Sequence, residues 1–299
     1  MSAEGWNAKS RGNATGYRIF GFFLRHFGLN FAYINLAYVV LYFVLAAPAQ
    51  RAALWDYYRR TWHYGRLKSA WCVYLHFFRF GQCLVDKMAI TQGLSDKFEF
   101  VAEGYDDFLE SLNRGSAIMI GAHVGAWETG TPFFGDYAKR MHIVMFDAEY
   151  QKIKEAIHRG APQLPYNIIA VNEDDLGSIL KISEALQHNA YVCMQGDRYV
   201  NNGRCERLDF MGREAVFPQG PFILGAKMRV PVYFYFSMRE GKKYHFYFYR
   251  ATVSTAGGSR ACQLDLMRQY VSRLEQVLHT YPQQWFNLYR FWSDPSAAV

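Results

Sequence analysis

Hydrophobic and polar positions follow two different patterns along the chain, and the pattern changes near Phe98. Before that point, apolar and aromatic residues recur at spacings of three and four, as in "WCVYLHFFRFGQCLVDKMAI" (71–90), which predicts helices throughout 49–93. After it, short apolar runs alternate with polar segments of helical period. The change predicts two regions: a membrane-associated helical region over residues 1–95 and an α/β region over residues 96–299.

The second region is predicted to form a sheet covered by helices. Its expected strands are "FEFV" (98–101), "SAIMIGA" (116–122), "HIVMF" (142–146), "NIIAV" (167–171) and "AYVCMQ" (190–195), with helices near 104–113, 125–138, 149–159 and 176–188. Such alternation is typical of a mainly parallel α/β sheet. "VPVYFYFSM" (230–238) and "KKYHFYFYRATV" (242–253) flank a charged turn and predict an antiparallel hairpin, followed by a helix over 259–279.

The first region holds an uncharged segment, "GLNFAYINLAYVVLYFVLAAP" (28–48), of 21 residues. At about 1.5 Å per residue a helix of this length measures roughly 30 Å, enough to cross a bilayer. Arginines lie on both sides of it, at 18 and 25 and at 51, 59 and 60, so its orientation stays open. Three interpretations remain: a spanning anchor, a helix in the membrane interface, or a buried helix of a soluble domain.

Charge favours a lipid or an acidic protein as partner. Residues 1–100 contain 12 of the 33 Lys and Arg and 5 of the 26 Asp and Glu, which leaves 21 of each sign in the remainder. The sequence has no helix-turn-helix, finger or RNP-type motif, which argues against nucleic-acid binding. Basic charge beside an apolar segment suits anionic headgroups or an acidic carrier protein. The five scattered cysteines form no C-x-x-C pair, and we expect reduced thiols, no metal site and no cofactor.

The stretch "SAIMIGAHVGAWETG" (116–130) carries the first candidate chemistry. His123 is expected where a strand ends, Gly125 in a tight turn, and Glu128 in the first turn of a following helix. A carboxylate there can hold one imidazole nitrogen, so that the other accepts a proton. No G-x-S-x-G elbow or nearby nucleophile accompanies the pair, which indicates activation of a substrate hydroxyl or amine. The alternative is a structural or chance pairing of the two residues.

A second candidate group follows "AYVCMQG". Asp197 and Arg198 are expected at the carboxyl end of another strand, beside His123 if the two strands are neighbours. With Asp197 beside it, Arg198 would then bind a phosphate or steady the oxyanion of a tetrahedral intermediate, together with backbone N–H groups of the helix start near Gly125. Arg204 is a weaker candidate for the same task. The alternatives are an ion pair of Arg198 with Asp197 or Glu128, and a solvated or headgroup-facing Arg204.

These residues carry a resemblance to a known family. "AHVGAWE" (122–128) resembles the His, four residues, Asp/Glu motif of glycerolipid acyltransferases. Together with "MQGDRYVNNGRCERLDFMG" (194–212), which includes a loop after the second strand end, "FPQGPFILGAKMRVPV" (217–232) and the apolar amino-terminal segment, it is similar to the bacterial late lipid A (lauroyl/myristoyl) acyltransferases over most of the chain. These belong to the lysophospholipid acyltransferase-like superfamily.

The resemblance implies a glycerolipid acyltransferase-like α/β fold and a site. His123 would be the general base and Glu128 its orienting partner, with an acyl thioester on acyl carrier protein or coenzyme A as donor and a lipid as acceptor. It also implies a place at the bacterial inner membrane, with the catalytic domain facing the cytoplasm. Departures from the family pattern in "QGDR" and "YVNNGRCER" leave the acceptor lipid open. Two other functions use the same residues: a lipid hydrolase or thioesterase, and a non-catalytic lipid-binding protein.

Overall fold

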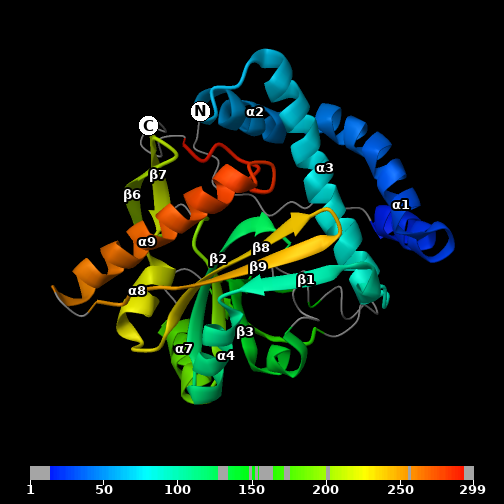
Figure 1. The fold of residues 1–299 in the computed structure, drawn as a ribbon. Helices are drawn as coiled ribbons and strands as arrows, with labels where there is room; N and C mark the ends of the chain where they lie inside the picture. The colour runs from blue at the N-terminus through cyan, green and yellow to red at the C-terminus, as the bar shows by residue number, and fades with distance from the viewer. Residues whose placement is uncertain are drawn as a thin grey trace.

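A seven-stranded sheet with helices on both faces forms the centre of the protein (Figure 1). The computed structural model describes residues 14–126, 134–147, 150, 151, 154, 164–171, 176–199, 203–254 and 257–292. The strands are β1 (Glu99–Glu103), β2 (Ala117–Gly125), β3 (Met141–Phe146), β4 (Asn167–Val171), β5 (Tyr191–Gln195), β8 (Val232–Glu240) and β9 (Lys243–Arg250). Each apolar run that predicted a strand contributes one of them, and the predicted α/β class is confirmed.

The strand order is β1-β9-β8-β2-β5-β3-β4, and every neighbouring pair is parallel except the hairpin β8–β9. Strand β2 is therefore central, between β8 and β5. Gly121 of β2 lies opposite Gln195 of β5. Continuing both strands by two residues brings His123 and Asp197 to the same edge of the sheet, the edge where parallel strands end and ligands usually bind.

Helices cover the two faces of the sheet according to the alternation of side chains along β8. Phe234 and Phe236 contact the Tyr270 ring of α9 (Gly258–Thr280), which packs with α8 (Gly220–Lys227). Tyr233, which directly precedes Phe234, contacts Phe108 of α4 (Tyr105–Arg114) on the opposite face. Helix α7 (Leu176–Gln187) packs on β4 and β5. The aromatic side chains of β8 and β9 thus form part of the core.

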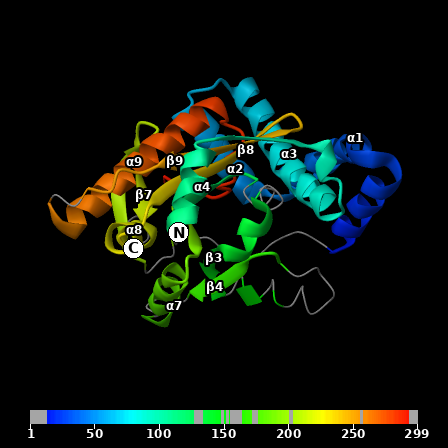
Figure 2. The same cartoon turned by 60° about the horizontal axis from the view of Figure 1, so that its bottom comes forward.

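The amino-terminal region is helical, as predicted. It consists of α1 (Ala14–Ala46), α2 (Pro48–Asp56), a π-helical turn (Tyr57–Thr61) and α3 (Arg66–Thr91), and a short 3-10 turn (Ser95–Lys97) leads into β1. Helix α1 is kinked at Gly28. Figure 2 shows α3 between α1 and the sheet. Helix α3 packs directly on the α/β region, through contacts such as the ion pair of Asp86 with Arg239 of β8. The predicted boundary between two regions at residue 95 therefore stays a prediction.

Three local predictions need revision. The predicted loop after residue 198 contains an antiparallel hairpin, β6 (Cys205–Phe210) and β7 (Arg213–Pro218). Strand β2 continues beyond residue 122 to Gly125, because Val124 forms an antiparallel bridge with Trp285 of the carboxyl-terminal segment. Of the helix predicted over 125–138, residues 135–140 form a 3-10 turn (Gly135–Arg140), while 127–133 lie outside the described residues. Most of 149–159 also lies outside them.

Candidate active site

His123 lies two residues before the end of β2, and its backbone is hydrogen-bonded on two sides. Its N–H donates to Oδ2 of Asp197 at 3.0 Å, and its carbonyl accepts from the N–H of Phe286 at 2.7 Å. The side chain keeps 24% of its surface exposed, although the strand around it is buried. A fixed backbone with a partly exposed ring is the arrangement that a proton-transferring histidine needs.

Asp197 is the carboxylate that contacts the His123 ring. It follows β5, is fully buried, and its Oδ1 lies 2.7 Å from Nδ1 of His123. Oδ2 accepts the His123 N–H and also the indole N–H of Trp285, at 3.0 Å each. Burial raises the pKa of Asp197, but the charge and hydrogen bonds of His123 and the charge of Arg198 together hold that pKa below its usual value. The carboxylate is thus ionised at neutral pH.

This contact fixes the tautomer of neutral His123. An ionised carboxylate only accepts hydrogen bonds, so the nitrogen facing it, Nδ1, carries the ring proton. Nε2 then has an unprotonated lone pair, and no described residue hydrogen-bonds to it. The ring is therefore prepared to accept a proton at Nε2.

Two glycines make the close approach of these strand ends possible. Gly196 lies between β5 and Asp197, where a Cβ would press against Ile120, Phe222 and Tyr270. Gly125 has φ of +53°, and a Cβ there would collide with the Ser237 carbonyl oxygen. The Gly125 N–H donates to the Gln284 carbonyl at 2.7 Å, which fixes the turn at Gly125.

The two predicted arginines occupy different places. Arg198 donates from Nη2 to the Phe286 carbonyl at 2.9 Å and acts electrostatically on Asp197, so it lies near the Asp197 carboxylate. Arg204 is exposed at the start of the β6–β7 hairpin, and its carbonyl accepts the Gln219 N–H. Glu128 lies outside the described residues, so its role as partner of His123 rests on the motif.

The sequence matches the model of one known protein family. The family model described as bacterial lipid A biosynthesis acyltransferase matches residues 77–294, more than two thirds of the chain. The chain belongs to this family. Membership implies acyltransferase activity, and the matched range contains β2, β5 and the His123–Asp197 contact. A search of curated proteins found no match.

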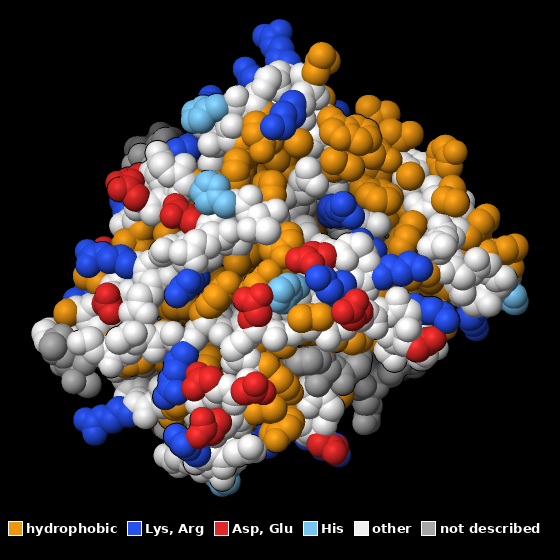
Figure 3. All heavy atoms as spheres, in the orientation of Figure 1, with side chains coloured by type: hydrophobic (Ala, Val, Ile, Leu, Met, Phe, Trp, Pro, Cys, Tyr) orange, Lys and Arg blue, Asp and Glu red, His pale blue; other side chains and the backbone are white. Residues whose placement is uncertain are grey.

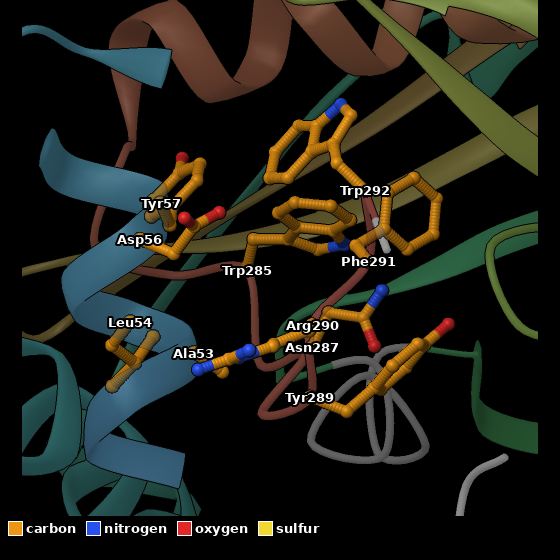
Figure 4. Close-up of a pocket in the computed structure, with 10 residues that line it drawn as sticks. All are labelled: Ala53, Leu54, Asp56, Tyr57, Trp285, Asn287, Tyr289, Arg290, Phe291 and Trp292. Atoms are coloured by element: carbon orange, nitrogen blue, oxygen red, sulfur yellow. The ribbon is translucent and has the colours of Figure 1, made fainter. Parts of the chain in front are cut away.

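The carboxyl-terminal segment of this acyltransferase supplies site residues that the sequence did not reveal. Residues 284–286 run beside the end of β2 and hold Gly125, Asp197 and His123 through the contacts above. Trp285 is packed edge-on against Tyr57, Phe291 and Trp292, as Figure 4 shows. The one signal in the sequence was a tryptophan in an aromatic-rich segment, because a buried tryptophan N–H requires an acceptor.

Proposed function

We propose that this protein transfers a fatty acyl group from an acyl thioester to a hydroxyl or amine of a lipid acceptor. His123 takes the acceptor's proton through Nε2 as the acceptor attacks the thioester carbonyl. When the tetrahedral intermediate collapses, the carbon–sulfur bond breaks and the imidazolium returns the proton to the leaving thiolate. The donor is acyl carrier protein or acyl-coenzyme A, either of which presents the same thioester. The reaction needs no metal and no cofactor in this proposal, because base and acceptor supply the nucleophile.

The single observation that carries the proposal is the contact of Asp197 with Nδ1 of His123. It sets the tautomer, and its negative charge stabilises the imidazolium that forms when the proton is taken. The partial exposure of the ring supplies access for a substrate. No nucleophile elbow occurs in the sequence, so the attacking group must come from the acceptor.

The other candidate residues have secondary roles in this proposal. Arg198, held by the Phe286 carbonyl, steadies the oxyanion of the tetrahedral intermediate or an acceptor phosphate. Exposed Arg204 binds a headgroup from the rim. Glu128 is the acidic residue of the motif, and we retain it as a second carboxylate acting on His123. Family membership favours a lipid A precursor as acceptor.

Association with the bacterial inner membrane, with the catalytic domain on the cytoplasmic side, belongs to the same proposal. Among the described residues one helix, over Arg18–Ala46, is long and apolar enough to cross a membrane. A lipid acceptor lies in the membrane, so the active site must work at the membrane surface. The excess of basic residues in the first third of the chain suits anionic headgroups.

The test is His123→Ala in the purified full chain, assayed with a labelled acyl thioester and extracted lipid acceptors. Removing a general base typically costs two to four orders of magnitude in rate, and we expect a loss of that size. His188→Ala is the matched control, since His188 is exposed just after α7 and its ring bonds the Glu184 carbonyl. Near-normal transfer by His123→Ala would refute the mechanism. Free fatty acid in place of acylated lipid would identify a hydrolase.

A further inference from the structure

Helix α1 has one face packed against the protein and one face exposed. The packed face carries apolar side chains that are less than a tenth exposed: Leu24, Leu29, Ala32, Leu36 and Val40. They lie on α3, where the Tyr74 hydroxyl also bonds the Ala37 carbonyl of α1 at 3.2 Å. Helix α1 is therefore part of the folded body and not a separate anchor.

A buried polar group fixes α1 to the sheet. The Tyr33 hydroxyl of α1 donates to Asp86 of α3, and the Asp86 carboxylate pairs with Arg239 of β8 at 2.7 Å. The side chains of Asp86 and Arg239 are 0% and 2% exposed, and Arg239 also donates to the Tyr33 oxygen at 3.0 Å. Separating α1 from α3 would leave this buried ion pair without one of its partners, which is costly.

The packing of α1 argues against a simple crossing of the bilayer. The kink at Gly28 leaves residues 29–46 as the straight part, about 27 Å long, which is near the lower limit for a helix that spans the hydrocarbon layer. Helix α3 is in turn attached to the active-site segment, since His76 bonds the Trp285 carbonyl at 2.9 Å. For α1 to cross the membrane in this packing, α3 and the catalytic region beside it would have to enter the bilayer as well.

From Phe27 to Leu45, the exposed residues of α1 are apolar apart from Asn30. Its large exposed side chains are Ile19, Phe22, Phe27, Phe31, Ile34, Tyr38, Leu41, Tyr42 and Leu45, and Leu67 and Trp71 at the start of α3 are exposed as well. Figure 3 shows hydrophobic side chains gathered on the side where α1 and α3 lie. The same two helices carry exposed basic residues, Arg18 and Arg25 on α1 and Arg66 and Lys68 at the start of α3. Apolar surface beside cations matches an anionic lipid surface.

We propose that α1 does not span the membrane but lies in its surface layer, with the exposed apolar face among the acyl chains and the basic residues at the phosphate headgroups. Both ends of α1 are then on the side of the catalytic domain. This inference deepens the proposed membrane association and rests on it.

The arrangement also holds the active site at a fixed position relative to the bilayer. From Arg239, the backbone N–H and carbonyl bond the side chain of Gln284 at 2.9 Å each, and the Gln284 carbonyl accepts the Gly125 N–H. Gly125 lies two residues after His123. The exposed face of α1 and the candidate base are thus connected by buried hydrogen bonds, which suits a soluble donor meeting a membrane-bound acceptor.

The topology of α1 is tested on the full chain with a protease-cleavable tag at each end, in inverted membrane vesicles and in intact spheroplasts. We expect both tags to be cleaved in inverted vesicles and both to be protected in spheroplasts. Cleavage of the amino-terminal tag in spheroplasts, with the carboxyl-terminal tag protected, would overturn the inference and leave membrane association standing. Recovery of the chain in the soluble fraction would overturn both.

The exposed face is tested by flotation of the purified protein with phosphatidylethanolamine–phosphatidylglycerol vesicles. Leu41→Asp with Leu45→Asp changes two side chains that are 54% and 74% exposed, so the fold is retained and circular dichroism checks this. We expect vesicle binding to fall roughly tenfold or more. Leu180→Asp on α7, where Leu180 is 70% exposed, is the matched control and should bind as the unmodified chain does. Equal binding by all three proteins would refute the assignment.

Discussion

Two histidines contact the same carboxyl-terminal segment, and only one of them is suited to chemistry. His76 of α3 is 0% exposed and lies between the Tyr58 hydroxyl and the Trp285 carbonyl, each 2.9 Å from a ring nitrogen. His123 of β2 is 24% exposed and has Asp197 on one nitrogen. The backbone of one short strand segment thus supports a structural histidine on one side and a candidate base on the other.

The two histidines differ in the partners of their ring nitrogens. Both ring nitrogens of His76 have neutral partners, whereas Nδ1 of His123 faces a carboxylate and the ring is partly exposed. Burial lowers the pKa of His76 to about 3, against the raising effect of the Trp285 carbonyl, so this ring stays neutral at any ordinary pH. His123 instead faces an ionised carboxylate and has an exposed edge. Histidine identity and burial alone therefore do not mark a base. A paired carboxylate together with access does.

The largest loss of activity is expected when the carboxylate that distinguishes His123 from His76 is replaced. Asp197→Asn keeps the shape of the side chain, but its amide then donates to Nδ1, which forces the proton onto Nε2 and removes the acceptor. We expect kcat/KM for acyl transfer to fall by about two to four orders of magnitude, with the folded state retained. Steady-state kinetics with a labelled thioester measure this, and circular dichroism checks the fold.

Glu128→Gln provides the second arm of that experiment. The motif assigns the orienting role to Glu128, whereas the structure shows Asp197 on the ring. If Asp197→Asn transferred acyl groups at a near-normal rate while Glu128→Gln did not, the orienting carboxylate would be Glu128. Equal losses would indicate that both carboxylates act on His123.

The sequence predicted the strand ends but could not show which carboxylate meets the histidine. Glu128 lies five residues from His123 and is visible as a local motif, whereas Asp197 is separated from it by 74 residues. Their meeting depends on β5 being inserted beside β2, ahead of β3 and β4 in the sheet, and no apolar pattern encodes that order. Residues 284–286 were missed for the same reason, since their partners are all distant in the chain.

A smaller loss of activity is expected when one hydrogen-bond donor to the Asp197 carboxylate is removed. Trp285→Phe keeps an aromatic ring but removes the N–H that Oδ2 of Asp197 accepts. Hydrogen bonds to charged groups contribute about 1.5–3 kcal/mol, so we expect kcat/KM to fall by roughly one to two orders of magnitude. Loss of this donor removes one of the hydrogen bonds that favour the ionised carboxylate, which raises the pKa of Asp197, and we expect the acid limb of the kcat/KM profile to move to higher pH.

Trp292→Phe is the control for that measurement. Trp292 belongs to the same aromatic cluster, but its N–H donates to the Phe210 carbonyl at 3.3 Å, away from Asp197. A purely structural effect would lower stability in both variants and leave both pH profiles in place. If the Trp285→Phe profile coincided with that of Trp292→Phe, Trp285 would have no part in setting the charge of Asp197.

The smallest effect on catalysis is expected at His76. In the unfolded chain a histidine binds a proton below about pH 6.5, while His76 in the folded protein stays neutral down to about pH 3. Its folded-state pKa is thus depressed, and the stability that this group contributes above pH 6.5 is lost as pH falls, by up to about 1.4 kcal/mol per unit. His76→Gln removes the titrating group, so the free energy of unfolding, measured with denaturant at pH 6.0 and 5.0, should change less with pH than in the unmodified chain. The rate of acyl transfer per folded molecule should stay within about twofold of the unmodified chain, because removing His76 leaves the Asp197–His123 contact in place. If the unfolding free energy of the variant changed with pH as steeply as that of the unmodified chain, His76 would be protonated in the folded protein.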